Sequence, residues 1–295
     1  MLGKHEFAAA LEEATKLNKK IPDDVMIYGF LTDANIELGN YADAEKSAQW
    51  MLNLRGANVP SLTRAAYLRE LFGDNEGAVE LMEMALRSVS PTEVEDRAWI
   101  TTQIAHLKLA SGKPQQAEEL LQQALSEFPN YHYALGKLAK VRIQQKRYDE
   151  AVQLYRRRYE AAPHAENLYD LAEALELAGK RSEAAQAFAE FEQKSLAETG
   201  RADNSNHELV FYYADHAKAT AESSGGSATR VRPPAGCVHT RLLCLGIVSE
   251  REIFRRADAD SASAGGWHSG CEAASPCGKD LSQAWRHSVG RKISF

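Results

Sequence analysis

Hydrophobic residues along most of this chain recur at the spacing of amphipathic α-helices. Residues 168–175 hold Leu, Leu, Ala and Leu at steps of three, one and three, and residues 184–191 hold Ala, Ala, Phe and Phe at the same steps. This spacing places the apolar side chains on one face of a helix. The two stretches flank a short turn at Gly179. Together they predict a hairpin of two helices that pack through their apolar faces.

The same hairpin pattern occurs five times. The turns begin 34, 39, 34 and 33 residues apart, at Gly39, Gly73, Gly112, Lys146 and Gly179. Five positions after these residues stand Ala44, Ala78, Ala117, Ala151 and Ala184, and Ala10 lies 34 residues before the first of them. Alanine lets two helices approach closely, and glycine at a helix end takes a left-handed conformation at little cost. Pro22, Pro129 and Pro163 stop helices. A single hairpin cannot bury its apolar face alone, so the repeat predicts a stack with a continuous core.

The repeat period, the turn glycine, the recurring alanine and the terminal proline together resemble the pattern of the tetratricopeptide repeat family. The resemblance covers roughly residues 4–222, with half of one hairpin, five complete hairpins and a further helix at about 206–222. It implies an all-α fold, a right-handed superhelical solenoid of stacked antiparallel hairpins. Single units depart from the family pattern. The aromatic residue favoured early in the first helix is Tyr28 in one unit but Leu135 and Leu168 in others, and a longer connection at 88–96 joins the second unit to the third.

The resemblance also implies a concave groove lined by the first helix of each hairpin, where a peptide or helix of a partner protein would bind. The inward-facing positions carried over to this sequence are Asp33, Tyr67, Glu70, Trp99, Thr102, His106, Tyr133, Lys140, Tyr169, Glu173 and Glu176. Aromatic side chains supply a large contact area at low entropic cost. We expect Tyr133 and Tyr169 to face the groove, whereas Trp99 fits the groove and the core between hairpins equally well.

One subset of the family binds the C-terminal carboxylate of chaperones through Lys, Asn and Arg at fixed groove positions. The matching places here hold Gly29 and Asp33 in the first complete unit, and Trp99 and Gln103 in the third. That carboxylate clamp is therefore absent, and the acidic groove residues would repel a carboxylate. We expect a partner segment of basic or apolar character.

These features predict an adaptor or scaffold for protein–protein interaction that is not an enzyme and needs no cofactor. Histidines in the repeat region stand singly, without metal-ligand spacing. No P-loop, G-x-G-x-x-G or G-x-S-x-G motif is present. The alternative hypothesis is a fragment of a larger repeat-containing protein whose catalytic or regulatory domain is missing from this chain.

Charge and hydropathy narrow the choice of partner and location. The formal net charge of −6 gives no electrostatic reason to expect nucleic acid as a partner. No apolar run approaches the roughly 18–20 residues that cross a bilayer, so membrane insertion is not expected. The first residues do not read as a signal peptide, which predicts a cytoplasmic chain as given. Ala10, however, marks a second helix, so we expect the natural chain to begin upstream of Met1, where a targeting signal would change that location.

The sequence changes character near Gly225. The remainder is rich in Gly, Ser and Arg, and we expect a poorly ordered tail at 223–295. It holds all four cysteines, at spacings that match zinc sites poorly: Cys237, Cys244, Cys271 and Cys277. Read one nucleotide out of frame, Cys244–Arg255 can encode AWALYRNGKYS, the end of a first helix, a turn and the start of a second. One hypothesis is a single-nucleotide shift near Lys218–Ser224; the other is an authentic disordered tail.

Overall fold

The computed structural model describes residues 1–54, 56, 58–201 and 204–216. Every described residue lies in the first of the two units into which the chain divides, residues 1–230. The expected tail at 223–295, its cysteines and the frame-shift hypothesis all lie outside the described residues. The end of the helix expected at 206–222 lies outside them as well.

The described residues form α-helices, a short 3-10 helix at Leu2–Lys4, and no strand. The α-helices in chain order are α1 (Phe7–Lys20), α2 (Val25–Glu37), α3 (Tyr41–Leu54), α4 (Val59–Leu71), α5 (Asn75–Ser88), α6 (Val94–Ala110), α7 (Pro114–Glu127), α8 (His132–Gln144), α9 (Tyr148–Ala161), α10 (Ala165–Leu177), α11 (Arg181–Glu198) and α12 (Asn206–Asp215).

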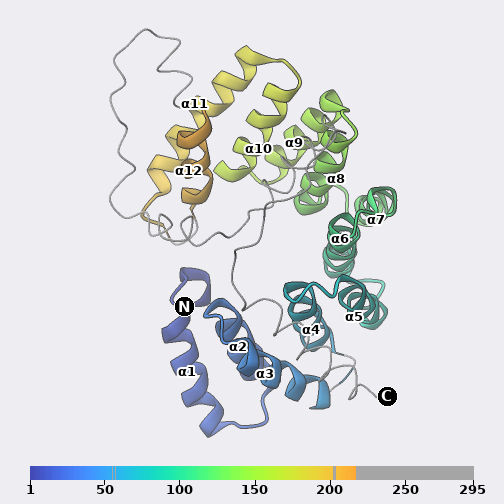
Figure 1. Ribbon diagram of the computed structural model, residues 1–295, viewed down its shortest axis with the longest axis vertical. Coiled ribbons are helices and arrows are strands. Elements are labelled where there is room, and N and C mark those ends of the chain that lie inside the picture. Colours follow the sequence, from blue (N-terminus) through green and yellow to red (C-terminus); the bar gives the residue numbers. More distant parts are fainter. Residues whose placement is uncertain (55, 57, 202–203, 217–295) are drawn as a thin grey trace, which may run out of the picture. The chain divides into compact units, whose positions relative to one another are not determined.

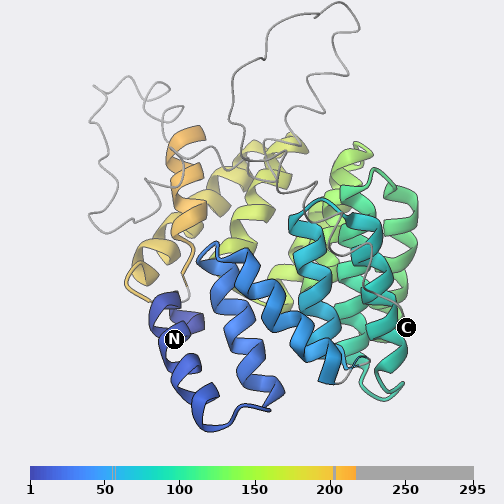
Figure 2. The same cartoon turned by 60° about the horizontal axis from the view of Figure 1, so that its bottom comes forward.

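Consecutive helices pack in pairs. The five hairpins are α2/α3, α4/α5, α6/α7, α8/α9 and α10/α11, with α1 packed on α2 and α12 on α11 (Figure 1). We call α2, α4, α6, α8 and α10 the first helices and their hairpin partners the second helices. Each second helix except α11 also packs on the first helix of the next hairpin. The colours in Figure 2, which run from blue to orange along the chain, show this succession of hairpins. The fold class expected from the repeat, an all-α solenoid of stacked hairpins, is confirmed.

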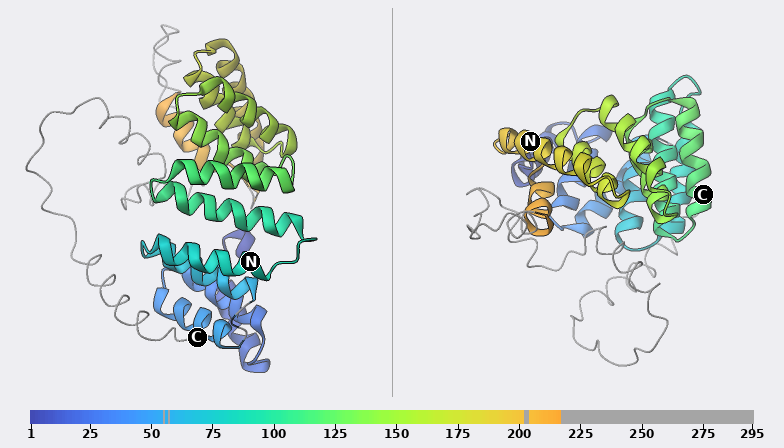
Figure 3. Two further views of the ribbon diagram at one scale, coloured as in Figure 1. Left: turned by 90° about the vertical axis from the view of Figure 1, so that its right-hand side faces the viewer. Right: turned by 90° about the horizontal axis from the view of Figure 1, so that it is seen from above.

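The recurring alanines lie where the helices of a hairpin meet. All five turn-associated alanines are buried, and Ala44, Ala78, Ala117 and Ala151 have no exposed surface. Larger apolar residues four positions further on, such as Leu121 and Tyr155, are buried beside them. The close pairing of helices within hairpins is visible from the side in Figure 3. A small residue at the closest approach and a large one a turn away let the paired helices pack closely.

The turns between paired helices share one backbone conformation. Gly39, Gly73, Gly112 and Gly179 have φ between 70° and 79°, and Lys146 takes the same left-handed conformation with φ of 60°. In all five turns the next residue donates its N–H to the carbonyl five residues earlier, for example Arg147 to Arg142 at 2.8 Å. This is the hydrogen bond of a Schellman motif, which ends a helix with a left-handed residue.

Candidate partner-binding surface

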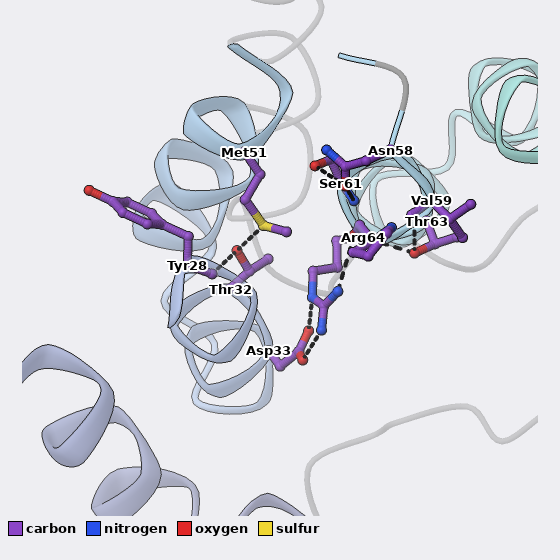
Figure 4. A network of polar contacts seen from close by, with 10 residues as sticks. Tyr28, Thr32, Asp33, Met51, Asn58, Val59, Ser61, Thr63 and Arg64 are labelled. Carbon is purple, nitrogen blue, oxygen red and sulfur yellow. Dashed lines mark hydrogen bonds and ion pairs between the residues drawn. The ribbon is translucent and has the colours of Figure 1, made fainter. Parts of the chain in front are cut away.

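Side-chain caps begin two of the first helices, α2 and α4. The Asp24 carboxylate accepts hydrogen bonds from the backbone N–H groups of Met26 and Ile27 at the start of α2. At the start of α4 the Asn58 side chain accepts one from the N–H of Ser61 at 2.9 Å (Figure 4). Each cap satisfies backbone donors that the first turn leaves unpaired. The caps therefore fix the residues at which α2 and α4 begin.

A bidentate ion pair joins α2 to α4. Arg64 donates from Nε and Nη2 to the two carboxylate oxygens of Asp33, both at 2.7 Å, and from Nη1 to the carbonyl of Pro60 (Figure 4). Gly29 makes this possible, because a Cβ atom there would lie 3.1 Å from the Arg64 guanidinium carbon. Asp33, expected in the groove, is thus already engaged by a cation of this chain.

A second polar link crosses three first helices. Nε2 of His106 on α6 lies 3.0 Å from a carboxylate oxygen of Glu70 on α4, and Nδ1 lies 3.1 Å from the Lys137 ammonium on α8. Lysine can only donate, so Nδ1 accepts and the ring proton is on Nε2, which donates to Glu70. Two residues predicted for the groove, Glu70 and His106, meet here.

The two links follow one register. Asp33 and His106 each stand six places before the turn residue of their hairpin, and their partners Arg64 and Lys137 each stand nine places before the next turn residue. Adjacent first helices therefore meet along the same diagonal in two different places of the stack. Polar contacts along this diagonal bind one hairpin to the next.

Two predicted groove residues are instead part of the core. Tyr169 has 0% of its surface exposed and packs on Phe188 and Phe191, with ring centroids 5.8 and 4.9 Å away. Thr102 is 1% exposed, and its hydroxyl donates to the carbonyl of Ala98 one turn earlier. Both side chains are buried, so neither is available to a partner. The expectation that Tyr169 faces the groove is corrected accordingly.

The remaining predicted residues keep some access to solvent. Tyr67 is 43% and Tyr133 51% exposed. Trp99 is half-buried and packs against two core clusters. It therefore combines the two alternatives expected for it, the groove and the core between hairpins. Among the charged residues predicted for the groove, Lys140 and Glu173 are partly exposed and Glu176 is exposed. A carboxylate oxygen of Glu176 on α10 also lies 3.6 Å from Nδ1 of His216, the residue that follows α12.

Five exposed apolar residues of the first helices were not predicted: Met26, Phe30, Leu71, Val94 and Leu177. A signal for the first of them was present. Met26, Trp99 and Tyr133 all stand 13 places before the turn residue of their hairpins, so the register that selected the two aromatics also selects the methionine. Leu71 and Leu177 likewise share a place, two residues before their turn glycines.

Among the described residues, no group of three or more His, Cys, Asp or Glu side chains is arranged to hold a metal ion. In the same part of the chain, none of the helices combines the length and apolar character needed to cross a membrane.

The comparison with known proteins agrees with this geometry. Residues 108–167, from the end of α6 to the start of α10, match the family model described as a tetratricopeptide repeat. No curated protein was found to match the sequence. The family-model match over these residues and the shared fold of the stacked hairpins confirm the resemblance to the tetratricopeptide repeat family.

Several solved structures share the fold at low identity. A chain of the APC/C hetero-tetramer Cut9–Hcn1 is 13% identical with a TM-score of 0.57; the match covers 74% of this chain and 40% of that one, so this chain spans less than half its length. PilF of Pseudomonas aeruginosa is 16% identical with a TM-score of 0.52, over 79% and 97% of the two chains. A thermophilic tetratricopeptide repeat protein of Thermus thermophilus, TTC0263, is 21% identical with a TM-score of 0.51, over 58% and 91%.

Proposed function

We propose that this chain is a protein-binding adaptor or scaffold that holds a peptide or helix of its partner on the exposed face of its first helices. One observation carries the proposal. Large apolar side chains are exposed on that face in four of the five hairpins, namely Met26, Phe30, Tyr67, Leu71, Tyr133 and Leu177. Met26 and Tyr133 share one place of the hairpin, and Leu71 and Leu177 share another. This recurrence distinguishes these four from singly scattered surface residues, which need no explanation.

The chemistry of this face favours apolar and basic partner segments. Methionine, phenylalanine and tyrosine offer a large, adaptable contact area for apolar side chains. Several carboxylates there, including Asp33 and Glu70, are already paired within the chain. The attraction for a cationic segment therefore depends on the carboxylates that have no such pairing.

Panning the full-length chain against a displayed library of random 12-residue peptides tests the proposal. The best peptides are then synthesised with a fluorescent label, and their affinity is measured by anisotropy. The double variant Tyr67→Ala/Tyr133→Ala removes two exposed aromatics from the first helices. The matched control is Leu54→Ala/Leu196→Ala, which removes two similarly exposed apolar residues from second helices.

We expect the first-helix variant to weaken binding by at least tenfold and the control by less than twofold. Circular dichroism melts of both variants should match the wild type, since none of the four side chains is buried. The proposal is refuted if no peptide is enriched, or if the two variants lose affinity equally.

A further inference from the structure

One part of the first-helix face is both aromatic and acidic. The exposed residues Leu38 and Tyr41 flank the turn between α2 and α3, and Tyr67 and Leu71 are one turn apart on α4. The ring of Tyr41 contacts that of Phe72 edge-on at 5.6 Å, which brings the α2–α3 turn against the end of α4. We call Leu38, Tyr41, Tyr67 and Leu71 the tyrosine patch.

Negative charge borders the tyrosine patch. The partial burial of the Tyr67 ring, and then the carboxylates of Glu37 and Glu70 with the nearby Tyr41, raise the pKa of the Tyr67 hydroxyl. Glu70 is engaged by His106. Glu37 is exposed at the end of α2, and neither it nor the Tyr67 hydroxyl has a hydrogen-bond or ion-pair partner among the residues that the structure describes. Glu37, which directly precedes Leu38, thus offers an exposed carboxylate acceptor at the edge of the tyrosine patch.

These groups together complement an arginine. A guanidinium is planar, stacks on aromatic faces, and donates two parallel hydrogen bonds to one carboxylate. The flanking leucines would pack against its aliphatic stem or against apolar neighbours in the partner. The chain uses similar chemistry internally, where the Arg64 guanidinium lies against Gly29 and binds Asp33 with two bonds.

We propose that the tyrosine patch, with Glu37 at its edge, receives an arginine side chain of the partner segment, flanked in that segment by apolar residues. This inference rests on the proposed function, because it assigns one anchor of the segment bound to the first helices. A lysine fits less well, since its ammonium is a compact, strongly hydrated charge that neither stacks nor binds a carboxylate with two parallel bonds.

A double-mutant cycle between protein and peptide tests the inference. The probes are the labelled 12-residue peptides selected on the full-length chain, each prepared with arginine, with its neutral isostere citrulline, and with lysine at the same place. They are titrated against the wild type, Glu37→Gln, and the control Glu80→Gln, which neutralises an exposed carboxylate on the second helix α5.

We expect citrulline to weaken binding at least tenfold on the wild type and on Glu80→Gln, but less than threefold on Glu37→Gln. Lysine should bind at least threefold more weakly than arginine. Selected peptides without arginine, an equal citrulline effect on Glu37→Gln and wild type, or lysine as good as arginine would overturn the arginine site and leave the proposed function standing. The absence of any selected peptide would overturn both.

Discussion

Tyr133 and Tyr169 lie on the first helices of neighbouring hairpins, yet replacing each by alanine should have opposite kinds of effect. Tyr133 is half exposed, so Tyr133→Ala removes contact area from the surface and little from the core. Tyr169 is fully enclosed between α10 and α11, beside Phe188 and Phe191. Tyr169→Ala therefore leaves a cavity at the centre of the last complete hairpin.

The expected cost of Tyr169→Ala follows from its burial. A buried aromatic side chain covers about 150–250 Å², which at about 25 cal/mol per Å² corresponds to roughly 4–6 kcal/mol. This is an upper bound, since the unfolded chain already buries part of that surface and alanine keeps its Cβ in place. We expect a loss of about 3–5 kcal/mol in the free energy of unfolding, in the range of aromatic-to-alanine changes in cores. Tyr133→Ala should cost less than about 1 kcal/mol.

Urea denaturation followed by circular dichroism at 222 nm measures both changes, and hydrogen exchange locates them. Each hairpin contacts mainly its neighbours, so a local defect opens locally. In Tyr169→Ala the slowly exchanging amides of α10 and α11 should exchange faster by about two to three and a half powers of ten. Those of α4 and α5 should change little. Tyr169→Phe, which keeps the ring, separates the hydroxyl from the packing.

A loss below about 1 kcal/mol for Tyr169→Ala would refute the placement of this ring in the core. So would peptide affinity that falls with Tyr169→Ala while the exchange of α10 and α11 stays unchanged. Either result would return Tyr169 to the groove, where the sequence first assigned it.

Three further predictions concern single contacts. A double-mutant cycle measured by urea denaturation tests the pair of Asp33 and Arg64. Asp33→Asn should lower the free energy of unfolding by roughly 1–2 kcal/mol in the wild type and by much less in the Arg64→Met background. Additive losses would contradict a direct pair. Lys146→Gly should raise the free energy of unfolding by about 0.5–1 kcal/mol, because glycine takes the left-handed turn without strain; an unchanged or lower urea midpoint would argue against this. Burial, Arg158 and His164 lower the pKa of His132. The unfolded chain therefore binds the proton more readily, and stability should fall as pH drops below the ordinary value of about 6.5. His132→Gln should flatten this fall between pH 7.5 and 5.5 in thermal melts, and parallel curves would contradict it.

The period of the sequence predicts the fold because it reflects local rules. Helix spacing, turn glycines and small alanines each constrain their own hairpin, and stacking follows since no hairpin can bury its apolar face alone. The pattern extended even to Lys146, whose place in the period predicted a turn without glycine and whose φ is left-handed like the others.

The candidate surface was predicted less completely, because the same helix carries both core and surface. Tyr169 and Tyr133 lie at different places in their hairpins. Only the three-dimensional packing shows that Tyr169 faces α11. Asp33 and Arg64 are 31 residues apart in the sequence, and they pair only because α2 and α4 lie against each other in the fold. Groove positions inferred from a family resemblance do not reveal which side chains of the same chain already pair with them. They also do not reveal the exposed apolar residues beside them, such as Phe30.

The shared diagonal between adjacent first helices also has a consequence for the order of the hairpins. The place six residues before a turn holds Asp33 in one hairpin and Lys140 in another, while the place it meets in the second hairpin holds Arg64. If the fourth hairpin were moved ahead of the second, lysine would face arginine where aspartate now does, and like charges would repel across the junction. The hairpins have one backbone design but are not interchangeable modules: their charges specify which unit follows which.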